Sequence, residues 1–201
     1  MKVNEVFYSL QGEGARAGTA SVFVRLQGCS AQGACYASGI RCDTEFESGR
    51  FQWEDRLLAD VLKFKCPWVI WTGGEPADQL TEEIVKLFHD AGLKQAIETS
   101  GLKPVPVGLD YICVSPKVAE HVMKKNFPLR KDGMHVDELR YVRHAGQSIP
   151  EPVLKAHHYF LSPHFDGLEL NQNNFEHCIK LCLANPQWRL SLQQHKAWKV
   201  L

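Results

Sequence analysis

The stretch Ala20–Thr44 constrains the fold of this 201-residue chain more than any other part of the sequence. It begins with an apolar, β-branched run, Ala20–Leu26, which predicts a buried strand. A loop rich in glycine and serine follows directly and carries Cys29, Cys35 and Cys42 within fourteen residues. Core packing explains a single buried cysteine, but it gives no reason for three thiols in one loop. The loop is therefore predicted to bind a soft metal or an iron–sulfur cluster, because thiolates bind both well.

The number of thiols distinguishes a structural zinc site from an iron–sulfur cluster. A structural zinc site normally has four closed ligands, and this loop offers three with no histidine nearby. An iron–sulfur cluster that leaves one iron open to another ligand needs only three. We therefore favour the cluster and keep a zinc site as the alternative. Cys66 is the fallback third ligand, but it stands at the start of the next apolar strand and so at the opposite end of the sheet.

Predicted strands alternate with predicted helices along the chain, which indicates an α/β fold with a largely parallel sheet and helical crossovers. A complete eight-fold barrel of this kind has about 250 residues. Because this chain has 201 residues, we expect an incomplete, TIM-type partial barrel with six or seven largely parallel strands. Residues 1–201 are expected to form one domain, since no linker or low-complexity segment divides them.

The hydrophobic patterns give the approximate bounds of these elements. The stretch Lys117–Gly133 is expected to be an irregular surface excursion, and Met1–Leu10 an edge strand or one half of a hairpin. The remaining strands are expected at Ala20–Leu26, Trp68–Thr72, Leu93–Glu98, Asp110–Val114, Val136–Val142, His157–Leu161 and Trp188–Leu192, and the helices at Trp53–Lys65, Thr81–Ala91 and Phe175–Leu183.

Composition excludes several kinds of partner. Lys plus Arg, 23 residues, equals Asp plus Glu, 23 residues, so bulk charge indicates neither a nucleic-acid nor a membrane partner. No apolar run approaches the ~20 residues of a membrane span, and Glu5, Gln11 and Glu13 interrupt the first twenty residues where a signal peptide would be apolar. Seven cysteines, an odd count, do not form a disulfide framework. We therefore expect the cytoplasm, where thiols stay reduced.

Small, polar or glycine-rich segments follow the expected strands at their carboxyl ends, where parallel sheets bind ligands. One such turn is ordinary, but five on one rim, with three thiols among them, indicate a binding site. Gly73 and Gly74 would let the backbone approach a ligand closely. The five segments are Gln27–Cys42, Thr72–Pro76, Thr99–Gly101, Ser115–Lys117 and Ser162–Phe165.

Short motifs follow one another in a characteristic order, namely Ser9–Gly14 (SLQGEG), Arg25–Cys29 (RLQGC), Cys42–Thr44 (CDT), Thr72–Pro76 (TGGEP), Val114–Lys117 (VSPK) and Trp188–Lys196 (WRLSLQQHK). Together they resemble the 7-carboxy-7-deazaguanine synthase family of the radical S-adenosylmethionine superfamily, from about Val3 to Lys196. The cysteine spacing differs from the usual C-x3-C-x2-C of that superfamily, because here it is C-x5-C-x6-C, with Gly39 where a thiol is expected.

The resemblance implies a carbon–nitrogen lyase that converts 6-carboxy-5,6,7,8-tetrahydropterin to 7-carboxy-7-deazaguanine, with loss of ammonia, in queuosine and 7-deazapurine biosynthesis. Its implied cofactors are one 4Fe–4S cluster per chain, S-adenosylmethionine and Mg²⁺. The implied partners are the small-molecule substrate, a second copy of the chain in a homodimer, and an electron donor such as flavodoxin or ferredoxin.

The resemblance also assigns roles to individual residues. Cys29, Cys35 and Cys42 would hold the cluster and Thr44 the Mg²⁺. Glu13, Gln193 and His195 lie in matching motifs without an assigned role. The substrate contacts would be Leu10, Gln11, Gly12, Arg25 and Thr72, and the S-adenosylmethionine contacts Gly74, Ser115, Pro116, Lys117, Ser162, Pro163, His164 and Phe165.

Two other functions stay open at this point. A radical activase that generates a glycyl radical on a partner protein would share the thiol loop and the Gly-Gly-Glu motif, but it would not explain Leu10–Gly14 or the terminal Gln-x-His-Lys run. A zinc-binding interaction module without catalysis would need the three thiols and one remote ligand. The other cysteines, Cys66, Cys113, Cys178 and Cys182, are most simply core residues.

Overall fold

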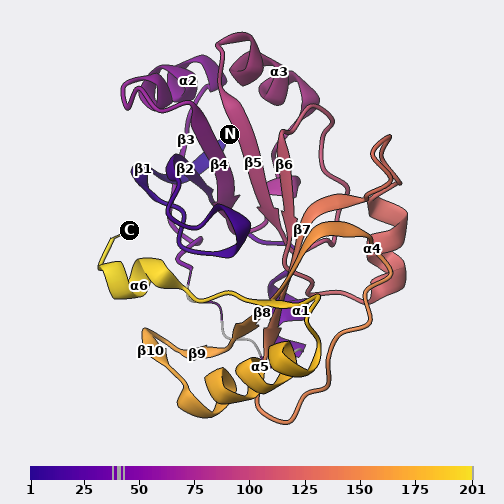
Figure 1. The fold of residues 1–201 in the computed structure, drawn as a ribbon. Coiled ribbons are helices and arrows are strands. Elements are labelled where there is room, and N and C mark those ends of the chain that lie inside the picture. Colours follow the sequence, from indigo (N-terminus) through magenta and orange to yellow (C-terminus); the bar gives the residue numbers. More distant parts are fainter. Residues whose placement is uncertain (38, 40–41, 43, 201) are drawn as a thin grey trace.

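The computed structural model describes residues 1–37, 39, 42 and 44–200 of the chain. Within these residues, the main element is a nine-stranded sheet with the strand order β11-β8-β7-β6-β5-β4-β2-β1-β3 (Figure 1). The strands from β11 to β2 in this order pair in parallel, whereas β1 and β3 pair antiparallel at one end. The prediction of an α/β fold with a largely parallel, open sheet is therefore confirmed.

The strands and helices have the following bounds. The parallel strands are β2 (Ala20–Leu26), β4 (Trp68–Gly73), β5 (Lys94–Thr99), β6 (Tyr111–Val114), β7 (Val136–Arg143), β8 (Ala156–Pro163) and β11 (Arg189–Leu190). The antiparallel strands are β1 (Lys2–Leu10) and β3 (Arg50–Phe51), and a separate hairpin consists of β9 (Phe165–Asp166) and β10 (Glu169–Leu170). The helices are α1 (Gln32–Ala37), α2 (Glu54–Leu62), α3 (Glu82–Asp90), α4 (Glu120–Asn126), α5 (Gln172–Ala184) and α6 (Gln194–Trp198), with 3-10 turns η1 (Gly14–Arg16) and η2 (Pro76–Asp78).

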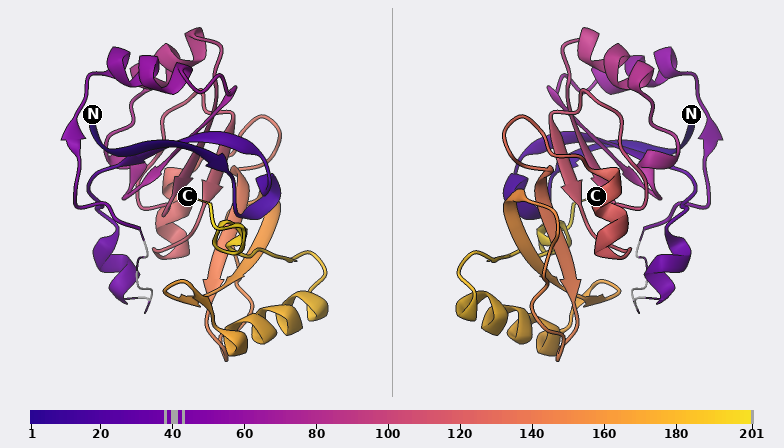
Figure 2. Two further views of the ribbon diagram at one scale, coloured as in Figure 1. Left: turned by 90° about the vertical axis from the view of Figure 1, so that its left-hand side faces the viewer. Right: turned by 90° about the vertical axis from the view of Figure 1, so that its right-hand side faces the viewer.

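The two faces of the parallel sheet have different chemistry because successive side chains of a strand point to opposite sides. On the outer face, Val24, Trp71 and Ile97 pack with α2 and α3, and Leu139 and Leu161 pack with α4 and α5. Figure 2 shows α2 and α3 at one end of the molecule and α5 at the other. The inner face carries charged and polar side chains, such as Glu98 and Arg140, and an apolar patch of Phe7, Phe23, Ile70 and Ala96.

The capping signals of α3 confirm the prediction made for this helix. Thr81 is the N-cap residue and its side chain accepts a hydrogen bond of 3.4 Å from the backbone N–H of Ile84. Gly92, one residue beyond the C-cap, has φ of +82°, a backbone conformation that favours glycine. Helix α2 ends earlier than predicted, at Leu62 rather than Lys65. Lys65 itself has φ of +52°, which is incompatible with a helix.

Three expectations about the fold are wrong in part. The stretch Lys117–Gly133 contains helix α4, whose Met123 is fully buried against the outer face of the sheet. For Met1–Leu10 the edge strand is wrong, because β3 pairs with the far side of β1, whereas the half-hairpin is confirmed, because β1 pairs antiparallel with the next strand, β2. The predicted strand Trp188–Leu192 is reduced to the two residues of β11. Helix α4 was missed because one buried methionine among charged neighbours produces no visible periodicity.

No helix in the described part of the chain combines the length and the apolar character that a membrane crossing requires. All seven cysteines are free thiols. Cys66, Cys113 and Cys178 are buried and Cys182 is half-buried, as expected of core residues. The Cys66 thiol donates to the backbone oxygen of Ala20, at the amino end of β2, so it lies far from the loop that follows β2.

Candidate active site

The three predicted cluster ligands lie on the segment that leaves the carboxyl end of β2. Cys29 and Cys35 are half-buried, and Cys42 is exposed. Burial raises the pKa of the Cys29 thiol, a hydrogen bond from the Ala31 backbone lowers it, and the nearby Glu75, Cys35 and Cys42 raise it further. The three thiols are therefore close enough to interact electrostatically. Their side chains do not converge, since no three His, Cys, Asp or Glu side chains of the described residues are grouped to hold a metal ion.

Both flanks of the thiol loop are held by hydrogen bonds. Asp78, in η2, accepts from the backbone N–H of Ser30 at 2.9 Å and from its hydroxyl at 2.6 Å, and also pairs with Lys103 at 2.6 Å. The backbone N–H of Gly28 donates to the carbonyl oxygen of Phe46 at 2.8 Å. Thr44, the predicted Mg²⁺ ligand, is half-buried near Cys42, whose thiol lies 3.8 Å from the Thr44 carbonyl oxygen. Asp43, in the same motif, lies outside the described residues.

The Thr72–Pro76 turn packs directly against the thiol loop. Gly73 has φ of +110°, and a Cβ atom on Gly74 would collide with the carbonyl oxygen of Gly28. The same carbonyl oxygen accepts a hydrogen bond of 3.1 Å from the backbone N–H of Glu75. The structure therefore gives Gly74, a predicted S-adenosylmethionine contact, a packing role beside Cys29.

Glu75 joins the carboxyl ends of β4 and β5. Its side chain is buried, and one carboxylate oxygen accepts from the Thr99 hydroxyl at 2.7 Å and from the Ala77 backbone N–H at 3.1 Å. The other oxygen accepts from the backbone N–H of Ser100 at 2.9 Å and from the Ser100 hydroxyl. Sequence reasoning quoted this glutamate in a motif but assigned it no role. The structure shows that it fixes the relative position of two loops of the site.

Two predicted substrate contacts meet at a third residue that sequence reasoning missed. Glu98, on the inner face of β5, accepts from the Gln11 side-chain amide at 2.9 Å and from the Thr72 hydroxyl at 3.4 Å. Arg25 pairs in register with Thr72 on the neighbouring strand β2. Its guanidinium forms an ion pair of 2.8 Å with Glu5. Gln11, Thr72 and Arg25 are therefore brought to one region of the inner face.

The segment after β1 runs across the inner face of the sheet rather than along its carboxyl rim. Gly12 accepts a hydrogen bond of 3.0 Å from the backbone N–H of Gln194, and a Cβ atom on Gly12 would collide with the ring of His195. The Ser191 hydroxyl accepts from the backbone N–H of Gly14 at 2.9 Å. The terminal motif thus packs on the glycine motif near the start of the chain. Leu10 remains partly exposed.

A buried network of charges lies beneath this segment, and sequence reasoning missed it. Arg140, on β7, forms ion pairs with Glu138 at 2.7 Å, with Glu98 at 3.5 Å and with Glu13. A small cavity of about 10 Å³ is lined by these four residues together with Gln11, Arg16, Ile70, Ala96, Ile97, Tyr111 and Cys113. The available signal was the placement of charged residues at inward positions of otherwise apolar strands, as in the VDELRYVR sequence of β7.

The predicted S-adenosylmethionine contacts after β6 lie close to the thiols. Lys117 donates to the Ser115 hydroxyl at 2.7 Å and to the Ser115 carbonyl oxygen at 3.1 Å. Burial lowers the pKa of Lys117, while the nearby Cys35 and Glu13 act to raise it. The Ser115–Lys117 segment, including Pro116, is thus brought between the thiol loop and the inner face.

The predicted contacts after β8 form a second group. The buried Ser162 hydroxyl has no hydrogen-bond partner among the described residues. Pro163 pairs with Arg143 at the end of β7, and the His164 ring stacks on His144 with 4.3 Å between ring centroids. Phe165 packs beneath Lys196, whose ammonium nitrogen lies 4.6 Å from the ring centroid.

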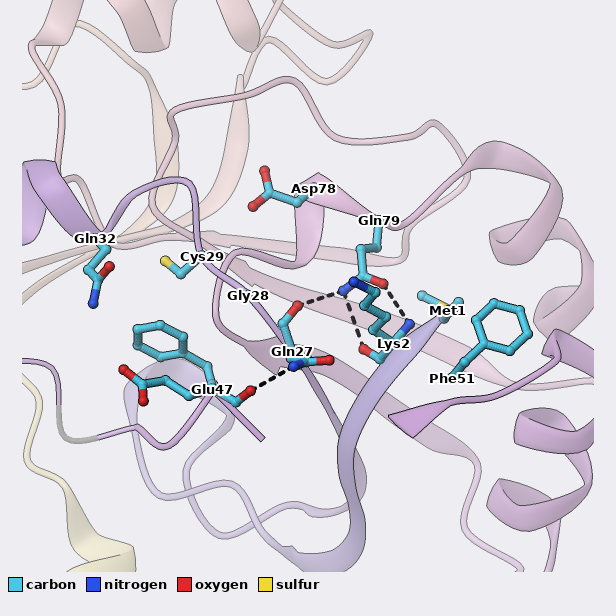
Figure 3. A pocket seen from close by; sticks show the side chains of 11 residues that line it. Met1, Lys2, Gln27, Gly28, Cys29, Gln32, Glu47, Phe51, Asp78 and Gln79 are labelled. Carbon is cyan, nitrogen blue, oxygen red and sulfur yellow. Dashed lines mark hydrogen bonds between the residues drawn. The ribbon is translucent and has the colours of Figure 1, made fainter. Parts of the chain in front are cut away.

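A larger cavity of about 680 Å³ lies on the other side of the thiol loop, beside β1 and β3 (Figure 3). Met1, Lys2, Phe46 and Phe51 line it, and Gln79 bridges its wall by hydrogen bonds to Lys2 and Gln27. Of the predicted site residues, only Cys29 lines this cavity. We place the candidate site on the inner face of the sheet, despite the smaller cavity there, because the charged and hydrogen-bonding side chains converge there.

Comparisons with known proteins give consistent results. No family model matches the chain. The 7-carboxy-7-deazaguanine synthase of Bacteroides thetaiotaomicron is 36% identical over 196 residues, which cover 97% of this chain and 96% of that protein. The Bordetella pertussis protein of the same name is 38% identical over 218 residues, covering 96% of each chain. A crystal structure of QueE from Escherichia coli superposes with a TM-score of 0.68 at 24% identity and covers 96% of this chain and 94% of that one, which shows the fold.

Proposed function

The chain belongs to the 7-carboxy-7-deazaguanine synthase family, and we propose that it converts 6-carboxy-5,6,7,8-tetrahydropterin to 7-carboxy-7-deazaguanine with release of ammonia. It is a radical S-adenosylmethionine enzyme of queuosine biosynthesis, as its relatives along nearly the whole chain indicate. The observation that carries the proposal is the meeting of Gln11, Thr72 and Glu98 on the inner face of the sheet, beside a loop with three free thiols.

Cys29, Cys35 and Cys42 would hold a 4Fe–4S cluster. The donor set fits this group, because the three residues are free thiols of one loop and each of the other two influences the pKa of Cys29. The longer cysteine spacing is compatible with this role, since α1 folds between Cys29 and Cys42. When bound there, the cluster would supply the electron that generates a radical from S-adenosylmethionine for hydrogen abstraction from the substrate.

The residues proposed to bind S-adenosylmethionine are Gly74, Ser115–Lys117 and Ser162–Phe165. Ser162 supports this role because its buried hydroxyl has a free hydrogen-bonding capacity among the described residues. Lys117 and Gly74 support it because they lie near the thiols. Thr44 is proposed as the Mg²⁺ ligand, since a hydroxyl oxygen is a hard donor and Mg²⁺ keeps several waters and substrate oxygens around it.

The inner face would bind the pterin. Gln11 and Thr72 are oriented by Glu98, while the Leu10–Gly12 backbone is fixed by Gln194. Arg25 suits the substrate carboxylate because of its planar, two-pronged donor geometry. Its ion pair with Glu5 is partly exposed, and the guanidinium would exchange this weak interaction for the carboxylate.

Further parts of the proposal concern the organisation of the enzyme. We propose that residues 1–201 form one domain, because one sheet contains both β1 and β11. We also propose a homodimer in the cytoplasm, reduced by a flavodoxin or a ferredoxin. The free state of all seven thiols supports a reducing compartment.

Anaerobic reconstitution tests this function. The protein is loaded with iron and sulfide, reduced, and incubated with S-adenosylmethionine, the carboxytetrahydropterin and Mg²⁺. We expect deazaguanine absorbance and an equivalent of ammonia. Formation of 5′-deoxyadenosine without that product would indicate another radical reaction, such as glycyl-radical activation. An equivalent of zinc without iron or sulfide would indicate a zinc-binding module instead.

A further inference from the structure

Both carboxylate oxygens of Glu138, on the inner face of the sheet, accept hydrogen bonds. Its side chain is 1% exposed. Oxygen Oε1 accepts from Arg140 Nε at 2.9 Å and from Arg140 Nη2 at 2.7 Å. Oxygen Oε2 accepts from the Tyr111 hydroxyl at 2.8 Å and from the backbone N–H of Ala15 at 2.9 Å. The carboxylate therefore links β7 and β6 to the segment that follows β1.

The segment Gln11–Arg16 packs directly against this carboxylate. Gly14 has φ of +69°, and a Cβ atom there would collide with the carboxylate of Glu138. Arg140 binds Glu13 of the same segment and also lies 3.5 Å from Glu98 of β5. The buried pair of Glu138 and Arg140 thus contacts both the backbone of the segment and the carboxylates of Glu13 and Glu98, which line the same small cavity.

We propose that Glu138 and Arg140 are positioning residues, which set the conformation of Gln11–Arg16 and the orientation of Glu13 and Glu98 for pterin binding. Neither residue needs to touch the substrate. The pair deepens the proposed function and rests on it, because the segment is the proposed pterin-binding segment.

Glu138 and Arg140 depend on each other because each compensates the buried charge of the other. Burial acts to raise the pKa of Glu138, but Arg140 and the hydrogen bonds from Ala15 and Tyr111 bring it below the ordinary value of a glutamate. The other titratable or charged groups around Glu138 are Arg16 and Glu13 from the segment above, Glu98 from β5, Cys113 from β6 and His158, its register partner on β8. Loss of Arg140 would leave a buried carboxylate without its principal counter-charge.

The first experiment compares two tyrosine hydroxyls of matched chemistry. Tyr111→Phe removes only the hydroxyl that donates to Glu138, whereas Tyr141→Phe removes a similar hydroxyl that donates to Glu120 at 2.6 Å on the outer face. Both affinities of the reconstituted holoenzyme are measured by calorimetry, one for the carboxytetrahydropterin and one for S-adenosylmethionine. We expect Tyr111→Phe to weaken pterin binding about tenfold, the lower end of the effect of one hydrogen bond to a charged group, and to leave S-adenosylmethionine binding unchanged.

Tyr141→Phe is expected to change neither affinity. Equal weakening of both ligands by Tyr111→Phe would indicate a general structural role and overturn the inference, as would an unchanged pterin affinity. Hydrogen exchange of the Gln11–Arg16 amides, measured without any ligand, separates this inference from the proposed function. Faster exchange in Tyr111→Phe but not in Tyr141→Phe supports the positioning role even if the pterin proves to be the wrong substrate, and equal exchange contradicts it.

The second experiment uses pH. In the native protein, the lowered pKa of Glu138 adds stability above the unfolded-state pKa of about 4.3, and this stability is lost as the pH falls through the folded-state value. In Arg140→Gln, burial should raise the folded-state pKa above the unfolded one, so the variant should lose stability as the pH rises.

We therefore expect the difference in melting temperature between the native protein and Arg140→Gln to widen from about pH 5 to about pH 8. The double variant Arg140→Gln/Glu138→Gln carries no unpaired carboxylate at this position, so the widening should disappear. A difference that is independent of pH, or a double variant that keeps the pH dependence, would contradict the coupling of the two residues. Should Arg140→Gln not fold at any pH, Tyr111→Phe and its control still decide the inference.

Discussion

The segment Gln11–Arg16 and the thiol loop are held in place by different kinds of interaction. Gln11–Arg16 is supported by the buried pair of Glu138 and Arg140, and by Ser191 and Gln194 from the other end of the sheet. The thiol loop is supported by exposed contacts such as Ser30 to Asp78. The polypeptide alone therefore forms the proposed pterin-binding surface. The proposed cluster ligands, in contrast, would need their inorganic group to complete their arrangement.

Replacement of one thiol should produce the largest effect and the sharpest contrast between the two regions. Cys35→Ala is expected to abolish the iron–sulfur absorbance and all 5′-deoxyadenosine formation in reconstituted protein. The stability of the apoprotein should change by less than about 1 kcal/mol, because the loop contributes little to the core. Absorbance and urea unfolding measure the two quantities.

Cys182→Ala is the control for this change, since Cys182 is a half-buried thiol of α5 outside the loop. It should keep a full cluster. A full cluster in Cys35→Ala would instead remove Cys35 from the ligand set and bring Cys66 back into consideration.

Replacement of Glu75 should have the next largest effect. Its carboxylate is buried and hydrogen-bonded, like the Glu138–Arg140 pair, although it lies beside the thiols. Glu75→Ala leaves the Thr99 hydroxyl and the backbone N–H groups of Ala77 and Ser100 without their acceptor. We expect the free energy of unfolding to fall by about 3 kcal/mol. Urea unfolding measures it against Glu82→Ala, an exposed glutamate in the first turn of α3. Equal losses in the two variants would show that the Glu75 hydrogen bonds contribute nothing to stability.

Gly74→Ala tests the contact between the Thr72–Pro76 turn and the thiol loop. The added methyl group collides with the backbone of Gly28, which cannot move without displacing Cys29. A cost of about 2 kcal/mol is typical of such overpacking, and the iron content of the reconstituted protein should fall with it. Gly33→Ala is the matched control, because nothing lies within 4 Å of a Cβ atom at Gly33. A normal iron content in Gly74→Ala would mean that the two loops move independently.

Asp78→Asn should have the smallest effect, since its interactions are partly exposed and screened by solvent. Burial acts to raise the pKa of Asp78, but Lys103 and Ser30 bring it below its ordinary value. The carboxylate therefore adds stability above the unfolded-state pKa of about 3.9, and this stability is lost as the pH falls through the folded-state value. We expect a loss of at most about 1 kcal/mol near neutral pH. Melting curves of the two proteins should converge in acid, and a constant difference would contradict this account.

Sequence reasoning predicted the parallel sheet and the principal helices because periodicity and caps are local properties. The strand Ala20–Leu26 has the bounds of β2, and Thr81 caps α3 as predicted. Helix α4 was not predicted, because its formation depends on the burial of Met123 by elements distant in the chain.

The sequence could indicate the inward-facing charges of the site, but the way in which they pair was beyond the reach of a single sequence. Glu98 is on β5, whereas Glu138 and Arg140 are on β7, and some of their partners are up to 127 residues away in the chain, as in the pair of Arg140 and Glu13. Motifs could identify Gln11 and Thr72, whereas only the fold reveals that both donate to Glu98. Pairings between distant strands decide which isolated charges meet, and no local pattern records them.

The hydrogen bond between Gly14 and Ser191 spans 177 positions of the chain. A ribosome releases the Gln11–Arg16 segment long before it has translated β11, so the nascent polypeptide exposes this segment without its last support. Helices α2 and α3 and the strand β4 between them can already pack during synthesis. Acquisition of substrate affinity should thus lag behind the folding of the first half, and a prematurely terminated product should be compact yet unable to retain the pterin.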